Sequence, residues 1–336
     1  MSFTMPPEWA PHERTWMAFP PSGPSVEDLD EAGLNSVRAA WAAVANAIVG
    51  FEPVTMVVDP ADVEAARALL DPVVTVATAS LDDAWMRDMG PTFAHGDTGE
   101  VRAIDWIFNG WGAQSWASWD NDQHVARQVA ELAGAEVESS AMVNEGGGIH
   151  VDGAGTVLVT ETVQLDPGRN PDWTREQVEA ELQRTLGVTR VVWVRRGLTR
   201  DYETFGTRGH VDIVACFASP DTILFHDQRN PEHPDHEVST EVRELLTAAG
   251  SWRLVPVPAP EVVRDDEGVV DYSYINHYVC NGAVILCAFN DPGDERAAQI
   301  LRDAYPGREI VLVDARLIFS RGGGIHCITQ QQPLPR

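Results

Sequence analysis

Helical segments recur along this sequence at a regular interval, with short β-branched segments that read as strands lying between them. After a first amphipathic helix near residues 36–48, five helical patterns follow about every 50 to 65 residues, near 61–70, 122–133, 175–186, 239–248 and 294–304. Repeats of this length are supersecondary units that bury their apolar faces against their neighbours. We therefore expect an α/β fold in which five ββαβ-like units close into a ring around a central site.

A doubly wound sheet is the alternative fold. Two observations count against it: each helix is accompanied by several strands, and no Gly-x-Gly-x-x-Gly motif follows a predicted strand. No linker-like segment divides the chain, so we expect one catalytic domain over residues 1–336.

The chain is strongly acidic, with 51 acidic residues against 24 basic ones and a formal net charge of −27. A nucleic acid or an anionic membrane surface requires clustered positive charge, so neither is expected as a partner. Every basic residue is arginine, which excludes a lysine Schiff base and a P-loop lysine. A field this negative would attract cations, although acids that only keep the protein soluble would give the same composition.

The four cysteines form no Cys-x-x-Cys pair, and a chain of this length does not need disulfides for stability. The N-terminal segment lacks the basic region and apolar run of a signal peptide, and no apolar run approaches the roughly 18 residues of a membrane span. We expect a cytoplasmic protein with free thiols.

Four short segments combine glycine with side chains that can do chemistry, each at the predicted edge of a strand. They are "DDAWMRDMGP" (82–91), "NEGGGIHVDG" (144–153), "GTRGHVDI" (206–213) and "RGGGIHCIT" (321–329). Glycine permits close approach of the backbone or a positive φ. Equivalent positions of a ring of repeats converge on its axis, so we expect these four segments to meet there.

Alternation of side chains along a strand separates the candidate histidines. If "IHCIT" is a strand, His326 and Cys327 face opposite ways, so His326 is badly placed as a base for that thiol. In "GHVDI", His210 and Asp212 would share a face, which makes His210 the better acid/base candidate. The "GGGIH" motif occurs twice, and its histidines, His150 and His326, are predicted to be structural.

Cys327 is the candidate nucleophile. Cys216, Cys280 and Cys287 lie in apolar runs and read as small buried hydrophobic residues, whereas Cys327 follows three glycines and precedes the polar "ITQQQ". A cysteine nucleophile served by a histidine distant in sequence is a known arrangement.

The acids of these segments predict the substrate class. Asp88, Glu145 and Asp212 would surround the thiol, and acids alone raise the pKa of a thiol. The site becomes productive if a cation enters between them. A planar guanidinium carries five donors that carboxylates can hold through paired hydrogen bonds, and its charge would favour the thiolate.

With these residues in view, the chain resembles the agmatine deiminases of the guanidine-modifying superfamily, which has the five-bladed α/β-propeller (pentein) fold. The likeness covers nearly the whole chain through "MPPEWAPHERTWMAFP", "DDAWMRDMGPTF", "DWIFNGWG", "EGGGIHVDGAGTVLVTE", "RNP", "RGL", "GHVDIVACF", "YINHYVCNG" and "GGGIHCITQQQP". The resemblance implies a covalent amidino-cysteine mechanism that releases ammonia and a ureido product, with neither a metal nor an organic cofactor. It also implies a homodimer or larger oligomer.

Residue roles follow from the same resemblance. It makes Cys327 the nucleophile and His210 the acid/base, while Asp88 and Asp212 clamp the guanidinium. Glu145 would support His210 or the substrate. Trp85 and Asn276 match positions expected to line the pocket. Glu203, Arg208 and Gly323 are further candidates for contact with the substrate, Arg208 as a residue that departs from the family pattern.

Two departures from the family pattern leave the substrate open. The family commonly reads Asn-Asp-Glu-Thr-Asn directly before Gly-His-Val-Asp, but here about three residues separate Glu203 and Thr204 from that motif. Gly324 takes the place of the usual Asn in the nucleophile loop. Arg208 and Arg321 could bind a carboxylate, so a guanidino acid is an alternative substrate, unless both arginines pair with acids of the protein. An amidinotransferase and a non-catalytic guanidine-binding protein are further alternatives.

Overall fold

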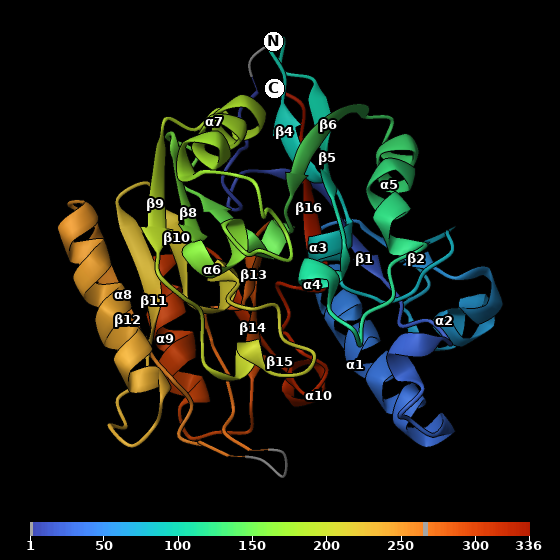
Figure 1. Cartoon of the computed structure of the whole chain (residues 1–336). Coiled ribbons are helices and arrows are strands. Elements are labelled where there is room, and N and C mark those ends of the chain that lie inside the picture. The colour runs from blue at the N-terminus through green and yellow to red at the C-terminus, as the bar shows by residue number, and fades with distance from the viewer. Residues whose placement is uncertain (1–2, 265–267) are drawn as a thin grey trace.

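The computed structural model describes residues 3–264 and 268–336 and places five small mixed sheets around a common centre, with the longer helices at the periphery (Figure 1). Four sheets have three strands each. Their strands are β4, β5 and β6 (Thr92–His95, Val101–Ile107, Glu136–Val143); β7, β8 and β9 (Ile149–Val151, Thr156–Thr160, Arg190–Val194); β10, β11 and β12 (Ala215–Ser219, Thr222–Asp227, Arg253–Pro258); and β13, β14 and β15 (Tyr278–Cys280, Ala283–Ala288, Glu309–Asp314).

Each of these sheets repeats one unit, called a blade below. Its first strand pairs antiparallel with the second, a helix follows, and the third strand returns parallel to the second. The four crossover helices are α5 (Val125–Ala133), α7 (Arg175–Leu186), α8 (Asp235–Ala249) and α9 (Asp294–Ala304). Parallel neighbours need such a crossover connection. The predicted ring of five ββαβ-like units is confirmed.

The remaining blade joins the two ends of the chain. Its strand order is β16 (Thr329–Pro333), β1 (His12–Ala18), β2 (Val54–Val58) and β3 (Thr75–Thr78). Helix α1 (Glu31–Ile48) connects β1 to its parallel neighbour β2, and α2 (Val63–Leu69) leads on to β3. Helix α1 is therefore the repeat helix of this blade. The expectation that the helix near 61–70 is one of the five repeat helices is wrong, because α2 belongs to an additional strand at the outer edge.

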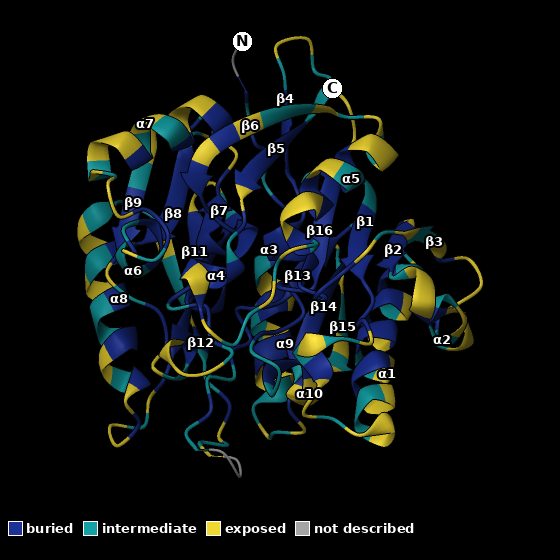
Figure 2. Ribbon diagram, turned by 45° about the vertical axis from the view of Figure 1, so that its right-hand side comes forward, coloured by how far each residue is buried: buried dark blue, intermediate teal, exposed yellow. Residues whose placement is uncertain are grey.

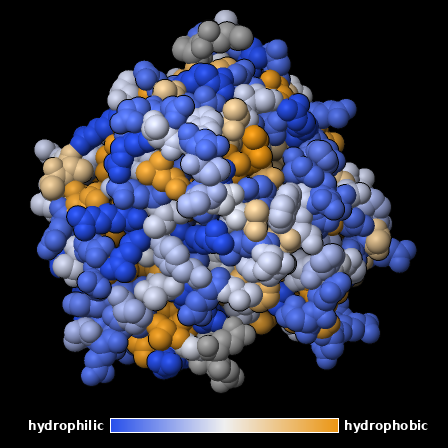
Figure 3. All heavy atoms as spheres, in the orientation of Figure 1, coloured by the Kyte–Doolittle hydropathy of each residue, from blue (hydrophilic) through white to orange (hydrophobic). Residues whose placement is uncertain are grey.

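Burial distinguishes the inner from the outer strand of each blade. The first strands of all five blades are buried along almost their whole length (Figure 2). Outer strands such as β3, β6, β12 and β15 contain exposed residues between less exposed ones. The inner strands thus surround the axis. The face in Figure 3 is mostly hydrophilic, with hydrophobic residues in small scattered groups. None of the described helices has the length and apolar composition needed to cross a lipid bilayer.

Strand β16 closes the ring. It pairs antiparallel with β1 from Met17 opposite Thr329 to His12 opposite Pro333, and the indole N–H of Trp16 donates to Gln332 Oε1 at 2.9 Å. Beyond β16 the chain makes two further backbone hydrogen bonds, from Leu334 N to Pro11 O and from Arg336 N to Gly99 O. The closing strand is fully buried, whereas these last residues are exposed.

This arrangement predicts a sharp difference between two truncations. Removing residues 334–336 forfeits these two backbone hydrogen bonds and the one between His95 Nε2 and the carbonyl of Leu334, and should cost about 1–4 kcal/mol of unfolding free energy. Removing 329–336 leaves β1 with an unpaired edge and exposes the buried core, so we expect no cooperative thermal transition by circular dichroism. A 329–336 truncation that melts within a few degrees of the full chain would show that the ring does not depend on β16.

Candidate active site

Each inner strand is preceded by a short segment that reaches the axis, and these five segments carry the chemistry. The residues are Asp88 in α3 (Met86–Met89) before β4, Glu145 at the start of η4 (Gly146–Gly148) before β7, His210 and Asp212 around η6 (Val211–Ile213) before β10, Asn276 before β13, and Cys327 before β16. The four segments expected to meet at the axis do so. The fifth, around Asn276, completes the set.

The local conformation differs from the expectation at two of these segments. "GHVDI" is not a strand at His210 and Asp212, because Val211–Ile213 forms a 3-10 helix. "IHCIT" is not a strand at His326 and Cys327 either, because residues 325–328 form a turn that leads into β16. The strand alternation expected for these two segments is therefore wrong. The structure still separates the histidines, because His210 lies among the site acids while both ring nitrogens of His326 bind carboxylates.

A buried chain of charges supports His210. Its Nε2 lies 3.1 Å from Glu145 Oε2, and the Nε–H of Arg169 donates to both oxygens of Glu145 at 3.0 Å. Although burial would raise the pKa of Glu145, Arg169 and His210 bring it down to about 2. Burial would likewise lower the pKa of His210, but Asp88 and Glu145 outweigh it and raise that pKa to about 9. His210 is therefore an imidazolium near neutral pH.

Asp88 is held from two sides. The indole N–H of Trp111 donates to its Oδ2 at 2.9 Å, and the backbone N–H of Gly147 donates to its Oδ1 at 3.1 Å. That same Oδ1 lies 3.8 Å from His210 Nδ1. Burial raises the pKa of Asp88 to about 6, and the neighbouring acids add to the rise while His210 opposes it. A cation placed beside Asp88 would stabilise its ionised form.

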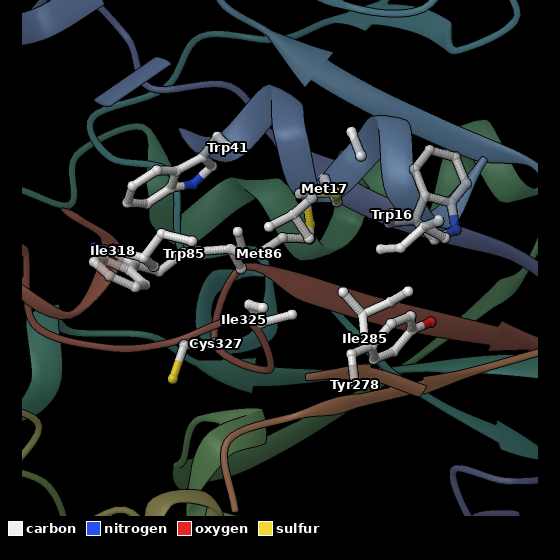
Figure 4. Close-up of a cluster of buried hydrophobic side chains, with 14 of the residues drawn as sticks. Trp16, Met17, Trp41, Trp85, Met86, Tyr278, Ile285, Ile318, Ile325 and Cys327 are labelled. Atoms are coloured by element: carbon white, nitrogen blue, oxygen red, sulfur yellow. The ribbon is translucent and has the colours of Figure 1, made fainter. Parts of the chain in front are cut away.

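Cys327 lies at the margin of the main apolar cluster, and its sulfur points away from the other labelled side chains (Figure 4). Its Sγ is 3.3 Å from Asn276 Nδ2 and 3.5 Å from Asp212 Oδ2. Burial, and then the negative charges of Asp212 and Asp88, raise the pKa of Cys327 well above that of an ordinary thiol. The thiol is therefore protonated near neutral pH unless positive charge enters the site.

Two buried polar atoms of the site lack a hydrogen-bond partner among the described residues. They are Nδ1 of His210 and Oδ1 of Asp212. Buried polar groups are rarely left unpaired, and exceptions are frequent where a ligand binds. One imidazolium donor, one carboxylate acceptor and one thiol are thus available to a bound molecule.

A cavity of about 210 Å³ has Trp85 in its wall, although neither Cys327 nor the other residues of the charged cluster line it. A Cβ atom placed on Gly323 would lie 2.8 Å from the Trp85 ring and 3.0 Å from Cys327 Sγ, so Gly323 separates the indole from the thiol and leaves no room for a side chain. Aromatic residues and acids line the cavity, with a single arginine among them: Trp41, Trp85, Trp116, Phe205, Glu27, Asp28, Asp82, Asp83 and Arg321. Asp83 is half-buried in this wall.

Three of the predicted substrate contacts lie elsewhere or are already paired. Glu203 is exposed at the surface. Arg208 lies 3.3 Å from Asp166 Oδ2, and Arg321 binds both carboxylate oxygens of Asp28, at 2.6 and 3.0 Å. Both arginines pair with acids of the protein, so neither is a free carboxylate receptor.

Several residues of the site were missed from the sequence. Arg169 of the "RNP" motif anchors Glu145, and Trp111 of "FNGWG" anchors Asp88. Asp201 accepts hydrogen bonds from the backbone N–H groups of Thr207, Gly209 and His210, and so fixes the loop that carries the histidine. The motifs were visible in the sequence, but nothing in their local pattern shows which distant side chain each one contacts.

One trio among the described residues, Glu8, His150 and His326, brings potential metal ligands within 4.8 Å of one another. Both ring nitrogens of His326 already lie at hydrogen-bond distance from carboxylates, 2.7 Å from Asp212 Oδ2 and 2.8 Å from Glu8 Oε2. Protons between these groups account for the geometry, whereas a metal would have to replace one of these hydrogen bonds.

The site can therefore bind a planar cation between carboxylates, beside a thiol that needs that cation to ionise. The protonated His210 can donate a proton to a leaving group. These properties suit attack of sulfur on the carbon of an amidinium or guanidinium group.

Comparison with known proteins agrees with this chemistry. Residues 4–333 match the family described as Porphyromonas-type peptidyl-arginine deiminase. A Streptomyces coelicolor protein named provisionally as an agmatine deiminase is 60% identical, with 99% of both chains covered. An agmatine deiminase of Stutzerimonas stutzeri is 40% identical over 99% of this chain and 96% of its own. The solved agmatine deiminase of Enterococcus faecalis has a TM-score of 0.92 at 32% identity, covering 99% of this chain and 96% of that one.

The charge pattern predicts selective alkylation of Cys327 by a cationic electrophile. After correction for their rates with glutathione, 2-chloroacetamidine should modify Cys327 at pH 7 at least about tenfold faster than its neutral isostere 2-chloroacetamide, because the amidinium gains charge-assisted hydrogen bonds. Peptide mass spectrometry would locate and time the modification. Asp88→Asn should remove most of the preference, and equal corrected rates in the unaltered protein would contradict the cation-binding geometry.

Proposed function

The chain belongs to the Porphyromonas-type peptidyl-arginine deiminase family, in which close relatives are agmatine deiminases, and we propose that its single catalytic domain hydrolyses agmatine to N-carbamoylputrescine and ammonia. One observation carries this proposal: a buried thiol next to Asp212, with Asp88 close by, shares the axis with an imidazolium held by Glu145 and Arg169. This reaction leads towards putrescine.

In the proposed reaction the guanidinium lies between Asp88 and Asp212. Asp212 Oδ1 has no hydrogen-bond partner within residues 3–264 and 268–336, so it is available to accept from a substrate N–H group. The positive charge of the substrate offsets the two carboxylates that raise the pKa of Cys327. The thiol gives its proton to solvent as the substrate binds, because His210 is already protonated, and the thiolate attacks the guanidinium carbon.

His210 acts twice. As an imidazolium it gives the proton of its unpaired Nδ1 to the departing nitrogen, which leaves as ammonia while an amidino group stays on the sulfur. The neutral imidazole then accepts a proton from water as its oxygen attacks the amidino carbon. The carbon–sulfur bond breaks, the remaining hydroxyl proton on the carbon is released as the ureido carbonyl forms, and uptake of a proton by the sulfur restores the thiol.

The aminobutyl arm of agmatine is assigned to the cavity beside Trp85. Its apolar section would contact Trp85, Trp116 and Phe205, and its ammonium would reach Asp83. Four acids and one arginine line this cavity, and that arginine, Arg321, already pairs with Asp28. This balance favours a cationic tail over the carboxylate of a guanidino acid.

Two other aspects of the proposal do not rest on the geometry of the site. Homo-oligomeric assembly, with a dimer as the smallest form, is proposed because of the family resemblance, and a cytoplasmic location is proposed because the four cysteines are free. An amidinotransferase would use the same thiol and histidine but would pass the amidino group to an amine, and likeness to agmatine deiminases over almost the full length favours water as the acceptor.

Ammonia release across a guanidine panel tests the function. We expect kcat/KM for agmatine to exceed that for arginine and for 4-guanidinobutyrate by at least about 100-fold, since both alternatives place a carboxylate in an acidic cavity. Cys327→Ser should abolish turnover, because a serine hydroxyl is not ionised near neutral pH. A higher kcat/KM for 4-guanidinobutyrate, or a loss of only a few-fold in the serine variant, would refute the assignment.

The same ammonia assay, with 1-butylguanidine added to the panel, examines the role of Asp83. Asp83→Asn should lower kcat/KM for agmatine about tenfold or more. The kcat/KM for 1-butylguanidine, which lacks the amine, should be nearly unaffected. An equal loss for both substrates would place the ammonium elsewhere.

The pH dependence follows from three perturbed groups. Asp88 and Asp83 must be ionised, and burial raises the pKa of each carboxyl to about 6, so kcat/KM should fall as the pH drops through about 6. His210 must be protonated, so kcat/KM should fall as the pH rises through about 9. The limbs report the coupled site rather than single residues. Glu145→Gln removes an anion that supports the imidazolium, so the alkaline limb should move to lower pH, and an unmoved limb would contradict this assignment.

A further inference from the structure

The two "GGGIH" motifs place their histidines in different electrostatic surroundings. His150 Nδ1 accepts a hydrogen bond from the backbone N–H of Phe217 at 3.2 Å, and burial lowers the pKa of His150 to about 3, so it is neutral. His326 lies between two carboxylates, with Nδ1 2.7 Å from Asp212 Oδ2 and Nε2 2.8 Å from Glu8 Oε2. An imidazole that donates to carboxylates from both nitrogens is an imidazolium.

We propose that His326 is a positioning residue whose imidazolium, shared between Asp212 and Glu8, keeps the Asp212 carboxylate ionised and turned with its free Oδ1 towards the bound substrate. The inference rests on the proposed function, because Asp212 matters there as one side of the guanidinium clamp. His326 itself touches none of the reacting atoms.

Asp212 needs this support more than the other site acids do. Glu145 has Arg169, and Asp88 has donors from Trp111 and Gly147. Within the described part of the chain, the hydrogen-bonding partners of Asp212 Oδ2 are His326 and the Cys327 thiol, and Oδ1 has none. A buried carboxylate with so few donors would otherwise take up a proton.

Geometry also explains why His326 is charged. Glu8 comes from the N-terminal segment, 318 residues away, and its Oε1 is fixed by the backbone N–H of Val279 at 2.8 Å. Arg87 stabilises the Glu8 anion, with Nη2 3.8 Å from Oε2. Burial raises the pKa of Glu8 in isolation, but His326 and Arg87 lower it overall.

Other charged and titratable groups surround the pair formed by His326 and Asp212. Burial and Arg87 disfavour the imidazolium, yet Glu8 and Asp212 outweigh them and raise the pKa of His326. The charge of His326 in turn lowers the pKa of its neighbours His150 and His277. Asp212 also faces His210, Arg87, Asp88 and Cys327, and burial of this acid is outweighed mainly by His326, so its pKa is lowered. A cavity of about 10 Å³ behind the pair is lined by neutral His150 and His277, together with Cys216 and Tyr305.

Loss of the His326 imidazolium should change the pH dependence of activity in one direction. Removing the imidazolium leaves Asp212 buried without its main cationic partner, so the pKa of Asp212 rises. The ionised carboxylate is required, so activity is lost as the pH falls through that raised pKa. The acid limb of kcat/KM should therefore move to higher pH. A residue that only fills space would lower the amount of active protein equally at every pH.

Two substitutions at position 326 separate the two hydrogen bonds. His326→Asn can place an amide N–H near the position of Nδ1 and still donate to Asp212, whereas His326→Gln places its amide near Nε2, towards Glu8. We expect kcat/KM for agmatine to fall on the order of 100-fold in His326→Gln and about tenfold in His326→Asn. The acid limb should move upwards in both, and further in His326→Gln. Filling of space alone predicts the reverse order, since glutamine is closer to histidine in size.

The twin motif supplies the matched control. His150→Asn and His150→Gln make the same changes in the other "GGGIH" copy and should leave the acid limb in place, with kcat/KM within a few-fold of the unaltered protein. Circular dichroism would verify folding of all four variants. If His326→Gln does not fold, Glu8→Gln carries the test, because it removes the anion that charges His326 and should also move the acid limb upwards.

The outcomes are distinguishable. Failure of the unaltered protein to release ammonia from agmatine would refute the proposed function. If the unaltered protein is active, but the position-326 variants have their acid limb at the same pH as the position-150 variants, only the positioning role is refuted. Greater activity in His326→Gln than in His326→Asn would refute it as well.

Discussion

The pairing of β16 with β1 is the interaction on which the rest of the structure depends. Four blades complete themselves from consecutive strands, but the blade containing β1 obtains its inner strand from the other end of the chain. The turn that leads into this strand carries Cys327. Ring closure and delivery of the thiol to the axis are therefore the same structural event, and a site assembled from five segments is complete only when the sheet of β1 is complete.

Closure also brings acids together at a cost that the structure offsets with cations. Asp88, Glu145, Asp212 and Glu8 are all buried close to the axis, and burial of an unpaired carboxylate is strongly unfavourable. Arg169, Arg87, His210 and His326 lie among them. Three groups surround the reacting carbon in the proposed mechanism: the Cys327 thiol, Asp212 Oδ1 and His210 Nδ1. Among the described residues, the last two atoms have no hydrogen-bond partner. Buried ion pairs of this kind are weak evidence for stability, and they are better understood as fixing which atoms remain free for substrate.

Much of the fold and of the candidate site could be predicted from the sequence, because these features depend on local sequence patterns. The helix period predicted the ring, and the glycine-flanked segments with Asp88, Glu145, His210 and Cys327 predicted the members of the site. Relations between segments could not be predicted in this way. Alternation along a strand gave the wrong geometry for His210 and His326, because the segments ahead of the inner strands are turns and 3-10 helices. The roles of Arg169, Trp111 and Glu8 depend on partners tens to hundreds of residues away. Arg208 and Arg321 looked free only because Asp166 and Asp28 are not their neighbours in the sequence.

The distance between β1 and β16 along the chain has a consequence for biosynthesis. Trp16 and its partner Gln332 are 316 residues apart. At ribosomal rates of about 5–20 residues per second, β1 spends roughly 15 to 60 s as an unpaired sheet edge before its partner is made. Such an edge is a template for pairing with other strands, so β1 in a nascent chain of this protein is open to wrong pairing throughout that interval. During the same interval no nascent chain carries the nucleophile, so a half-made protein has no catalytic activity towards cellular guanidines.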